Sequence, residues 1–116
     1  MRFTYDFAEI NRKVPMIEFL DALTVRERAK VLAYIEKLVE LKSKGIAPKE
    51  NLSKHLEDGI FELRVSIETR ISRSFYFYEA ERKLIFTHGF IKKTQKTPGS
   101  QIIKAKSIRT AWRGEK

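Results

Sequence analysis

The 116-residue sequence predicts an α+β fold in which helices pack on one antiparallel sheet. Apolar residues recur with helical spacing in the first half of the chain, and then alternate with polar residues along three segments of the second half. The length is typical of one domain, and a hydrophobic content of 42% is enough to form a core. We therefore expect residues 1–116 to form a single domain with the element order β-α-α-β-β-β-α.

The first half of the chain predicts one strand and two helices. Residues 2–7 alternate in polarity, which indicates a short strand. Pro15 fits the first turn of a short helix, to about residue 22, because a missing N–H is harmless there. Thr24 and Glu27 have the spacing of a capping box and mark the start of a second helix, which Gly45 ends. The apolar stripe of this second helix consists of Val31, Leu32, Ile35, Leu38 and Val39.

The second half of the chain predicts a three-stranded meander followed by a helix. Residues 61–67, 71–78 and 84–88 alternate in polarity and are joined by short links. In the third segment, the alternation predicts that one face of the strand contains Leu84, Phe86 and His88. Thr97 and Pro98 have the residue types of the N-cap and first position of a last helix. Its apolar face is expected to contain Ile102, Ala105, Ile108 or Arg109, and Trp112.

The positive charge is concentrated in the second half of the chain. Lysine and arginine total 24 against 15 acidic residues, which gives a net charge of +9. Residues 1–59 contain 11 basic and 10 acidic residues and residues 60–116 contain 13 and 5, so their net charges are +1 and +8. Such a one-sided field is expected of a polyanion-binding protein, although a surface that merely confers solubility would have the same composition.

The residue inventory excludes several classes of site and protein. Without cysteine there are no disulfides and no thiolate nucleophile. His55 and His88 are not at ligand spacing and carboxylates are few in the second half, so we expect no metal site and no cofactor. The N-terminus lacks the pattern of a signal peptide, and apolar runs such as Phe75–Tyr78 are far too short to span a membrane. We therefore expect a cytoplasmic protein with no membrane partner.

Three residues stand out from the patterns of their strands or from the composition. Arg73 lies on the apolar side of its strand, so it must reach a sheet edge, pair with an acid such as Glu62, or project into a ligand cleft. His88 ends the third predicted strand and is either structural or an acid–base catalyst. Arg64 lies opposite the apolar side of its strand and is either ordinary surface or part of a site.

Three motifs resemble the RelE/ParE superfamily of toxin–antitoxin toxins. They are LEDGIFELR at residues 56–64, Arg73 before an aromatic strand, and HGFIKKTQKTP at residues 88–98. The similarity extends over residues 2–113 and is greatest to the HigB-like, phage-derived branch. It implies a RelE-like compact sheet with two N-terminal helices and a C-terminal helix. It also implies a toxin of a type II toxin–antitoxin system, which cleaves mRNA, commonly on the ribosome, and is neutralised by a small helix-turn-helix antitoxin.

The resemblance also implies which residues lie at the RNA. By position they are Arg64, Arg73, His88, Lys92, Lys93 and Lys96. We expect Arg64, Arg73 and His88 to be catalytic, with Arg73 as a phosphate clamp and His88 or a lysine in proton transfer. The three lysines would anchor the RNA backbone. Tyr76 or Tyr78 would either stack on a base or simply pack in the sheet.

The chemistry that this inventory allows is a metal-independent cleavage of RNA. RNA contains its own nucleophile, the 2′-hydroxyl, so the protein needs only to align it, transfer protons and stabilise negative charge. Two other functions remain open at this point. One is a toxin of the same superfamily that inhibits DNA gyrase, and the other is a non-catalytic module that binds RNA or the ribosome.

Overall fold

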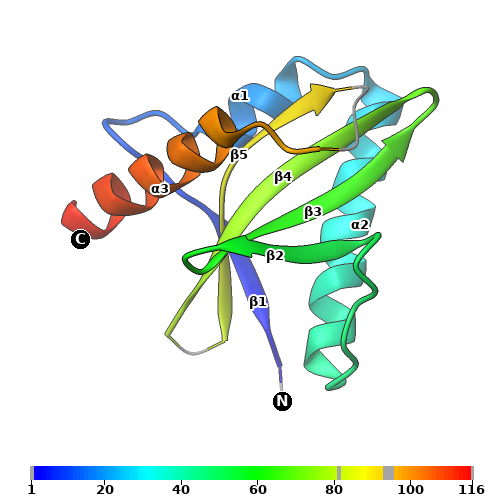
Figure 1. The fold of residues 1–116 in the computed structure, drawn as a ribbon, viewed down its shortest axis with the longest axis horizontal. Coiled ribbons are helices and arrows are strands. Elements are labelled where there is room, and N and C mark those ends of the chain that lie inside the picture. The colour runs from blue at the N-terminus through cyan, green and yellow to red at the C-terminus, as the bar shows by residue number, and fades with distance from the viewer. Residues whose placement is uncertain (1, 81, 93–95, 116) are drawn as a thin grey trace.

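The computed structural model describes residues 2–80, 82–92 and 96–115 and confirms the predicted α+β class (Figure 1). Two helices cover one face of a five-stranded sheet and a third helix packs on the other face. The elements are β1 (Thr4–Phe7), α1 (Pro15–Asp21), α2 (Val25–Ser43), β2 (Ser53–Glu57), β3 (Ile60–Ile67), β4 (Arg70–Glu79), β5 (Lys83–Lys92) and α3 (Gly99–Gly114). The order therefore contains one strand, β2, that the sequence pattern did not predict.

The sheet has the strand order β1-β5-β4-β3-β2. The meander from β3 to β5 is antiparallel, as predicted, and the unpredicted β2 also pairs with β3 in the antiparallel sense. β1 pairs with β5 in parallel, with Thr4 opposite Lys83, so the prediction of a wholly antiparallel sheet was wrong. The physical reason is the path of the chain. It crosses from one edge of the sheet to the other through α1 and α2 and then meanders back, which brings the first and last strands together at one edge (Figure 1).

β2 was missed because its residues, SKHLE, have no apolar alternation. The strand is held by its pairing with β3 and by a tight hairpin turn between the two strands. Asp58 and Gly59 in this turn both have positive φ, 50° and 75°, which is the combination that a type I′ turn requires. The Asp-Gly pair was therefore the signal that would have predicted the hairpin.

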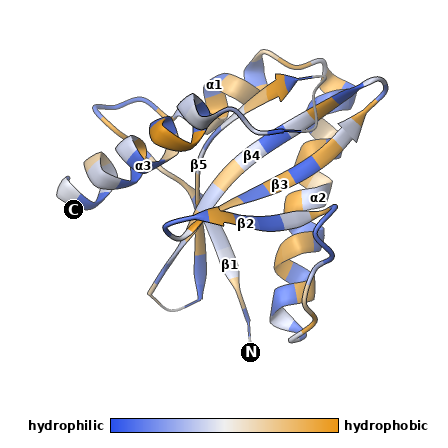
Figure 2. Cartoon of the chain, in the orientation of Figure 1, coloured by the Kyte–Doolittle hydropathy of each residue, from blue (hydrophilic) through white to orange (hydrophobic). Residues whose placement is uncertain are grey.

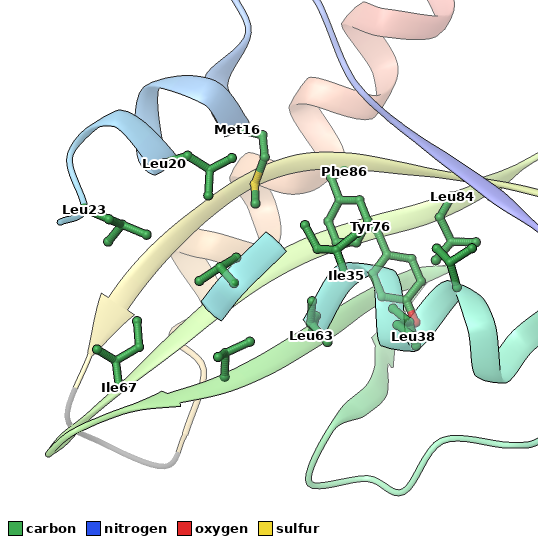
Figure 3. Close-up of a cluster of buried hydrophobic side chains, with 13 residues drawn as sticks. Met16, Leu20, Leu23, Ile35, Leu38, Leu63, Ile67, Tyr76, Leu84 and Phe86 are labelled. Atoms are coloured by element: carbon green, nitrogen blue, oxygen red, sulfur yellow. The ribbon is translucent and has the colours of Figure 1, made fainter. Parts of the chain in front are cut away.

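Each face of the sheet has its own hydrophobic core. The core under α1 and α2 contains Met16, Leu20, Ile35, Leu38, Leu63, Tyr76 and Phe86, which point toward one another in Figure 3. The core under α3 contains Ile60, Phe75, Phe77, Ile85, Ala105 and Ile108. Figure 2 shows that α2 and α3 carry both apolar and hydrophilic residues along their length, as expected for helices with one buried face. Because both faces are covered, Ile60 and Glu62 of β3 are buried on the α3 face, whereas Ser66 near the end of the strand is exposed.

The predicted helix starts are confirmed for α2 but not for α3. Thr24 and Glu27 form the reciprocal bonds of a capping box. At α3 the N-cap is Pro98, with no side-chain hydrogen bond, and the helix begins at Gly99. The prediction of Thr97 as N-cap was therefore wrong, because the Thr97 hydroxyl donates to a carboxylate in the sheet instead.

A β-bulge in β5 decides where His88 lies. The register between β4 and β5 shifts between Ser74 and Tyr76, so that Thr87 and His88 are both opposite Phe75. The extra residue reverses the alternation after Phe86. His88 consequently stacks on Phe75 under α3, whereas Phe86 belongs to the core under α2. The prediction that His88 lies on the side of Leu84 and Phe86 was wrong for this reason.

Candidate nucleic-acid interface

A buried carboxylate holds two arginines side by side on the α3 face of the sheet. Arg64 on β3 and Arg73 on β4 are cross-strand partners, and Glu62 precedes Arg64 by two residues on the same face. Arg64 donates from Nε to Glu62 Oε2 at 2.7 Å, and Arg73 donates from Nη1 to Glu62 Oε1 at 2.9 Å. Like charges in directly opposite positions repel. The carboxylate between them is what allows the two guanidinium groups to share this site.

Thr97 connects the same cluster to the turn before α3. Its hydroxyl donates to Glu62 Oε1 and accepts from Arg73 Nη1 at 3.2 Å. Burial alone would raise the pKa of Glu62. Hydrogen bonds from Thr97, Arg64 and Arg73 outweigh burial, so the pKa lies below its ordinary value and the carboxylate is ionised at neutral pH.

The two arginines differ in exposure. The Arg73 side chain is 0% exposed and lies behind Thr97, so the pairing with Glu62 that the sequence pattern allowed is the one observed. The Arg64 side chain is 22% exposed. Among the described residues, its hydrogen bond to Glu62 engages Nε and leaves the two terminal nitrogens available to a ligand. Arg64 is therefore the arginine of this pair that a phosphate could contact directly.

His88 is enclosed between the sheet and α3. Its exposed fraction is 2%, Nε2 lies 2.9 Å from Gln101 Oε1 and Nδ1 lies 3.1 Å from the Thr87 hydroxyl. Burial lowers the pKa of His88 to about 4, the hydrogen bond to Gln101 opposes the shift, and the charge of Lys104 adds to it. His88 is therefore neutral at pH 7. Because Gln101 Oε1 can only accept, Nε2 carries the proton.

A cationic groove opens beside the cluster. It has a volume of about 340 Å³ and lies between β2, β3 and the start of α3. It is lined by Lys54, His55, Leu56, Arg64, Lys96, Thr97 and Ile102. None of these lining residues is acidic, and Lys54 is placed beside Arg64 because it pairs in register with Glu62. The groove thus presents two lysines and one arginine to a bound anion.

The remaining predicted site residues lie elsewhere. Lys92 is exposed at the end of β5, where it pairs with Ile71 of β4. Lys93 lies outside the described residues. Tyr76 is fully buried under α2, where its hydroxyl is 2.6 Å from Ser53 Oγ. Tyr78 lies on the same side, with Lys42 Nζ 4.9 Å from its ring. The sheet therefore separates both tyrosines from the groove.

Sequence reasoning missed three residues that shape this site. Lys54 lies on the unpredicted strand β2, so no pattern connected it with Arg64. Gln101 was not distinguishable from the other polar residues of the last helix. Thr97 was assigned to a helix cap, whereas its contact with Glu62, 35 residues away, depends on the tertiary fold.

Within residues 2–80, 82–92 and 96–115, no three His, Asp or Glu side chains lie close enough together to hold a metal ion. None of the described helices combines the length and the apolar character needed to cross a membrane.

A family model described as "Phage derived protein Gp49-like (DUF891)" matches residues 18–110. This match includes all of α2, the whole meander and most of α3. The chain belongs to the Gp49-like family. The Gp49-like proteins are a family of RelE/HigB-type toxin-like proteins. A search of curated proteins gave no match to this Gp49-like chain.

Proposed function

We propose that this Gp49-like protein is the toxin of a toxin–antitoxin pair and acts as a metal-independent endoribonuclease on ribosome-bound mRNA. Membership of a RelE/HigB-type toxin-like family supports the toxin role. The observation that carries the nuclease proposal is the groove, which is lined by Lys54, Arg64 and Lys96 and by no acidic residue. A site of this kind suits an RNA backbone and a transition state that gains negative charge.

In the proposed reaction, Arg64 contacts the scissile phosphate. Its terminal nitrogens form a planar fork that can bind two phosphate oxygens, and its Nε stays on Glu62, which fixes the direction of the fork. Lys54 and Lys96 bind neighbouring phosphates. The substrate's 2′-hydroxyl attacks the phosphorus and gives up its proton to water, and the 5′-oxygen of the next nucleotide leaves and takes up a proton from water. The products are a 2′,3′-cyclic phosphate and a 5′-hydroxyl.

Arg73 and His88 support this site from behind in the proposed mechanism. Arg73 neutralises Glu62 and, with Thr97, connects it to the turn before α3. His88 holds Gln101 and so orients the first turn of α3. Both are positioning residues in this proposal, because a substrate in the groove touches neither. Tyr76 and Tyr78 have no part in it.

The partners in this proposal are mRNA, the ribosome and a small helix-turn-helix antitoxin. The antitoxin neutralises the protein by covering the groove or by blocking its access to the ribosome. A net charge of +8 in residues 60–116 favours rapid association with a polyanion or an acidic partner.

Induced expression in bacteria, followed by mapping of transcript 5′ ends, tests the proposal. We expect growth arrest and new 5′ ends inside coding sequences. Arg64→Ala should lower cleavage by about 10²–10³-fold, the usual loss for one donor to a developing negative charge. Lys13→Ala, which removes an exposed charge outside the groove, is the matched control and should cleave like the parent. Growth arrest with intact transcripts and gyrase-linked DNA breaks would contradict the nuclease proposal.

A further inference from the structure

A second hollow, of about 460 Å³, lies at the outer edge of β3. β2 pairs with β3 as far as Leu63, and the next N–H, that of Arg64, donates to the carbonyl of Leu52 at 2.8 Å. Residues 65–67 have no strand neighbour on this side among the described residues. α2 and the segment 46–52 form the walls of this hollow. The end of β3 beyond its pairing with β2 therefore borders a hollow and not another strand.

The lining of this second hollow combines an apolar surface with positive charge. Leu41, Leu52 and the half-buried ring of Tyr34 supply the apolar part. Lys37, Lys49 and Arg64 supply three cations, and no acidic residue lines the hollow. The Tyr34 ring centre is 5.7 Å from Lys37 Nζ and 6.0 Å from Lys30 Nζ, so the aromatic surface is bordered by ammonium groups. A flat apolar surface with cations at its border suits a nucleotide, which has an aromatic base and an anionic phosphate.

Arg64 connects the second hollow to the groove. Arg64 is the one residue found in the lining of both among the described residues, with its guanidinium bound to Glu62 and its backbone N–H donating to the carbonyl of Leu52. A single strand of RNA that passes Arg64 in the groove is therefore next to the second hollow, and the cationic lining continues from Lys96 and Lys54 through Arg64 to Lys49 and Lys37.

We propose that the hollow beside Tyr34 is a subsite for a nucleotide that flanks the cleaved one in the same single-stranded RNA. Its base packs on Tyr34 and Leu52, and its phosphate is bound by Lys37 and Lys49. This inference rests on the proposed function, because it assumes that the groove holds RNA. It adds that recognition extends beyond the groove and across the edge of β3.

Fluorescence anisotropy with labelled, fully 2′-O-methylated RNAs, which resist cleavage, tests the subsite. A trinucleotide is the short probe for the groove, and an octanucleotide is the longer probe for the groove and the second hollow together. The Lys37→Ala/Lys49→Ala double variant changes two exposed side chains, so its folding is not at risk. We expect it to bind the octanucleotide about tenfold more weakly than the parent, because the two cations that bind the phosphate of the flanking nucleotide are removed. Its trinucleotide affinity should change less than twofold.

Two further measurements separate the subsite from general electrostatics. The log–log salt slope of octanucleotide binding should be smaller by about 0.7 in the Lys37→Ala/Lys49→Ala variant than in the parent, which corresponds to the loss of one phosphate contact. The matched control, Lys13→Ala/Arg26→Ala, removes two exposed charges that line neither hollow and should keep the parent's preference for the longer RNA. Tyr34→Leu keeps an apolar side chain but removes the ring, and should weaken octanucleotide binding alone.

The results that would overturn the subsite differ from those that would overturn the proposed function. Suppose that the parent binds the trinucleotide. If the double variant then binds the octanucleotide as tightly as the parent, or loses the same affinity for both RNAs, the proposal of a subsite is wrong and the proposal that the groove binds RNA is unaffected. If the parent binds neither RNA at low salt, the groove itself is not an RNA site.

Discussion

Glu62 is the residue on which the geometry of the site depends. It is fully buried and accepts hydrogen bonds from two arginines and a threonine, which come from three different segments of the chain. A buried charge is tolerated only when it is paired and hydrogen-bonded. Removal of one partner therefore affects the stability of the protein as well as the position of Arg64.

Arg73→Met is expected to lower the free energy of unfolding by about 3 kcal/mol, because it leaves the buried Glu62 carboxylate without one of its compensating charges. Urea unfolding at pH 7 measures this change. Arg70→Met is the matched control on the same strand, since Arg70 pairs with Glu27 at a more exposed position and should contribute less than about 1 kcal/mol. Equal losses in the two variants would show that the Arg73 pair is no more important than a surface pair.

His88 makes the stability of the protein depend on pH in the mildly acidic range. Its pKa is about 4 in the folded protein against 6.5 in the unfolded chain, so the unfolded state binds a proton first as the pH falls. The associated stability is fully present above pH 6.5 and is lost between pH 6.5 and 4, by up to about 3 kcal/mol. His88→Gln should remove this slope in urea unfolding between pH 7.5 and 4.5. Exposed His55 gives the control, His55→Gln, and a steep slope that survives in His88→Gln would refute the assignment.

The sequence predicted the residues of the cluster better than their roles. Arg73 was recognisable because it interrupts an apolar alternation, and pairing with Glu62 was among the outcomes expected for it. The face of the sheet on which His88 lies was not predictable, since a single bulge residue moves it to the opposite side. Lys54 was overlooked because its strand has no periodicity of its own.

At the scale of elements, the packing of α1 on β5 depends on a close approach at Gly89. A Cβ atom at Gly89 would lie 2.5 Å from the ring of Phe19 on α1. Only glycine allows the helix to lie this near to the strand beside the bulge. α1 and the bulge that positions His88 are in this way parts of one packed unit.

Gly89→Ala is expected to destabilise the protein by about 1–3 kcal/mol, as is usual for overpacking, because the Phe19 ring or the whole helix must move. Thermal unfolding measures the effect. Phe19→Ala in the same chain should recover part of the loss by making room. Gly114→Ala, at a site with no atom within 4 Å of the added Cβ, should leave the melting temperature nearly unchanged. A Gly89→Ala protein as stable as the parent would mean that α1 does not pack closely on β5.

The elements that the sequence predicted well are those with a strong local signal. The capping box at Thr24, Pro15 at the first turn of α1 and the alternation of β3 and β4 all appear where they were expected. β2 and the parallel pairing of β1 depend on contacts between segments distant in sequence, which periodicity does not report. The same is true of Thr97, which contacts Glu62 instead of capping α3.

At the scale of the whole molecule, the excess charge and the groove coincide. Residues 60–116 contain most of the net charge, and they supply Arg64 and Lys96, while the first half supplies Lys54 from the strand next to them. A surface whose charges only confer solubility is not expected to gather cations, without acidic residues, along one groove. Family membership, the position of the charge and the buried support beneath Arg64 lead to the same proposal.

The chemical nature of the cleaved ends tests that proposal most directly. Purified protein is incubated with ribosomes programmed with a defined mRNA, and the downstream fragments are offered to polynucleotide kinase with and without prior phosphatase treatment. We predict labelling without phosphatase, because attack by the 2′-hydroxyl leaves a 5′-hydroxyl, and no cleavage when the nucleotide at the cut is 2′-O-methylated. Downstream fragments that carry a 5′-phosphate, or undiminished cleavage of the methylated mRNA, would contradict the account.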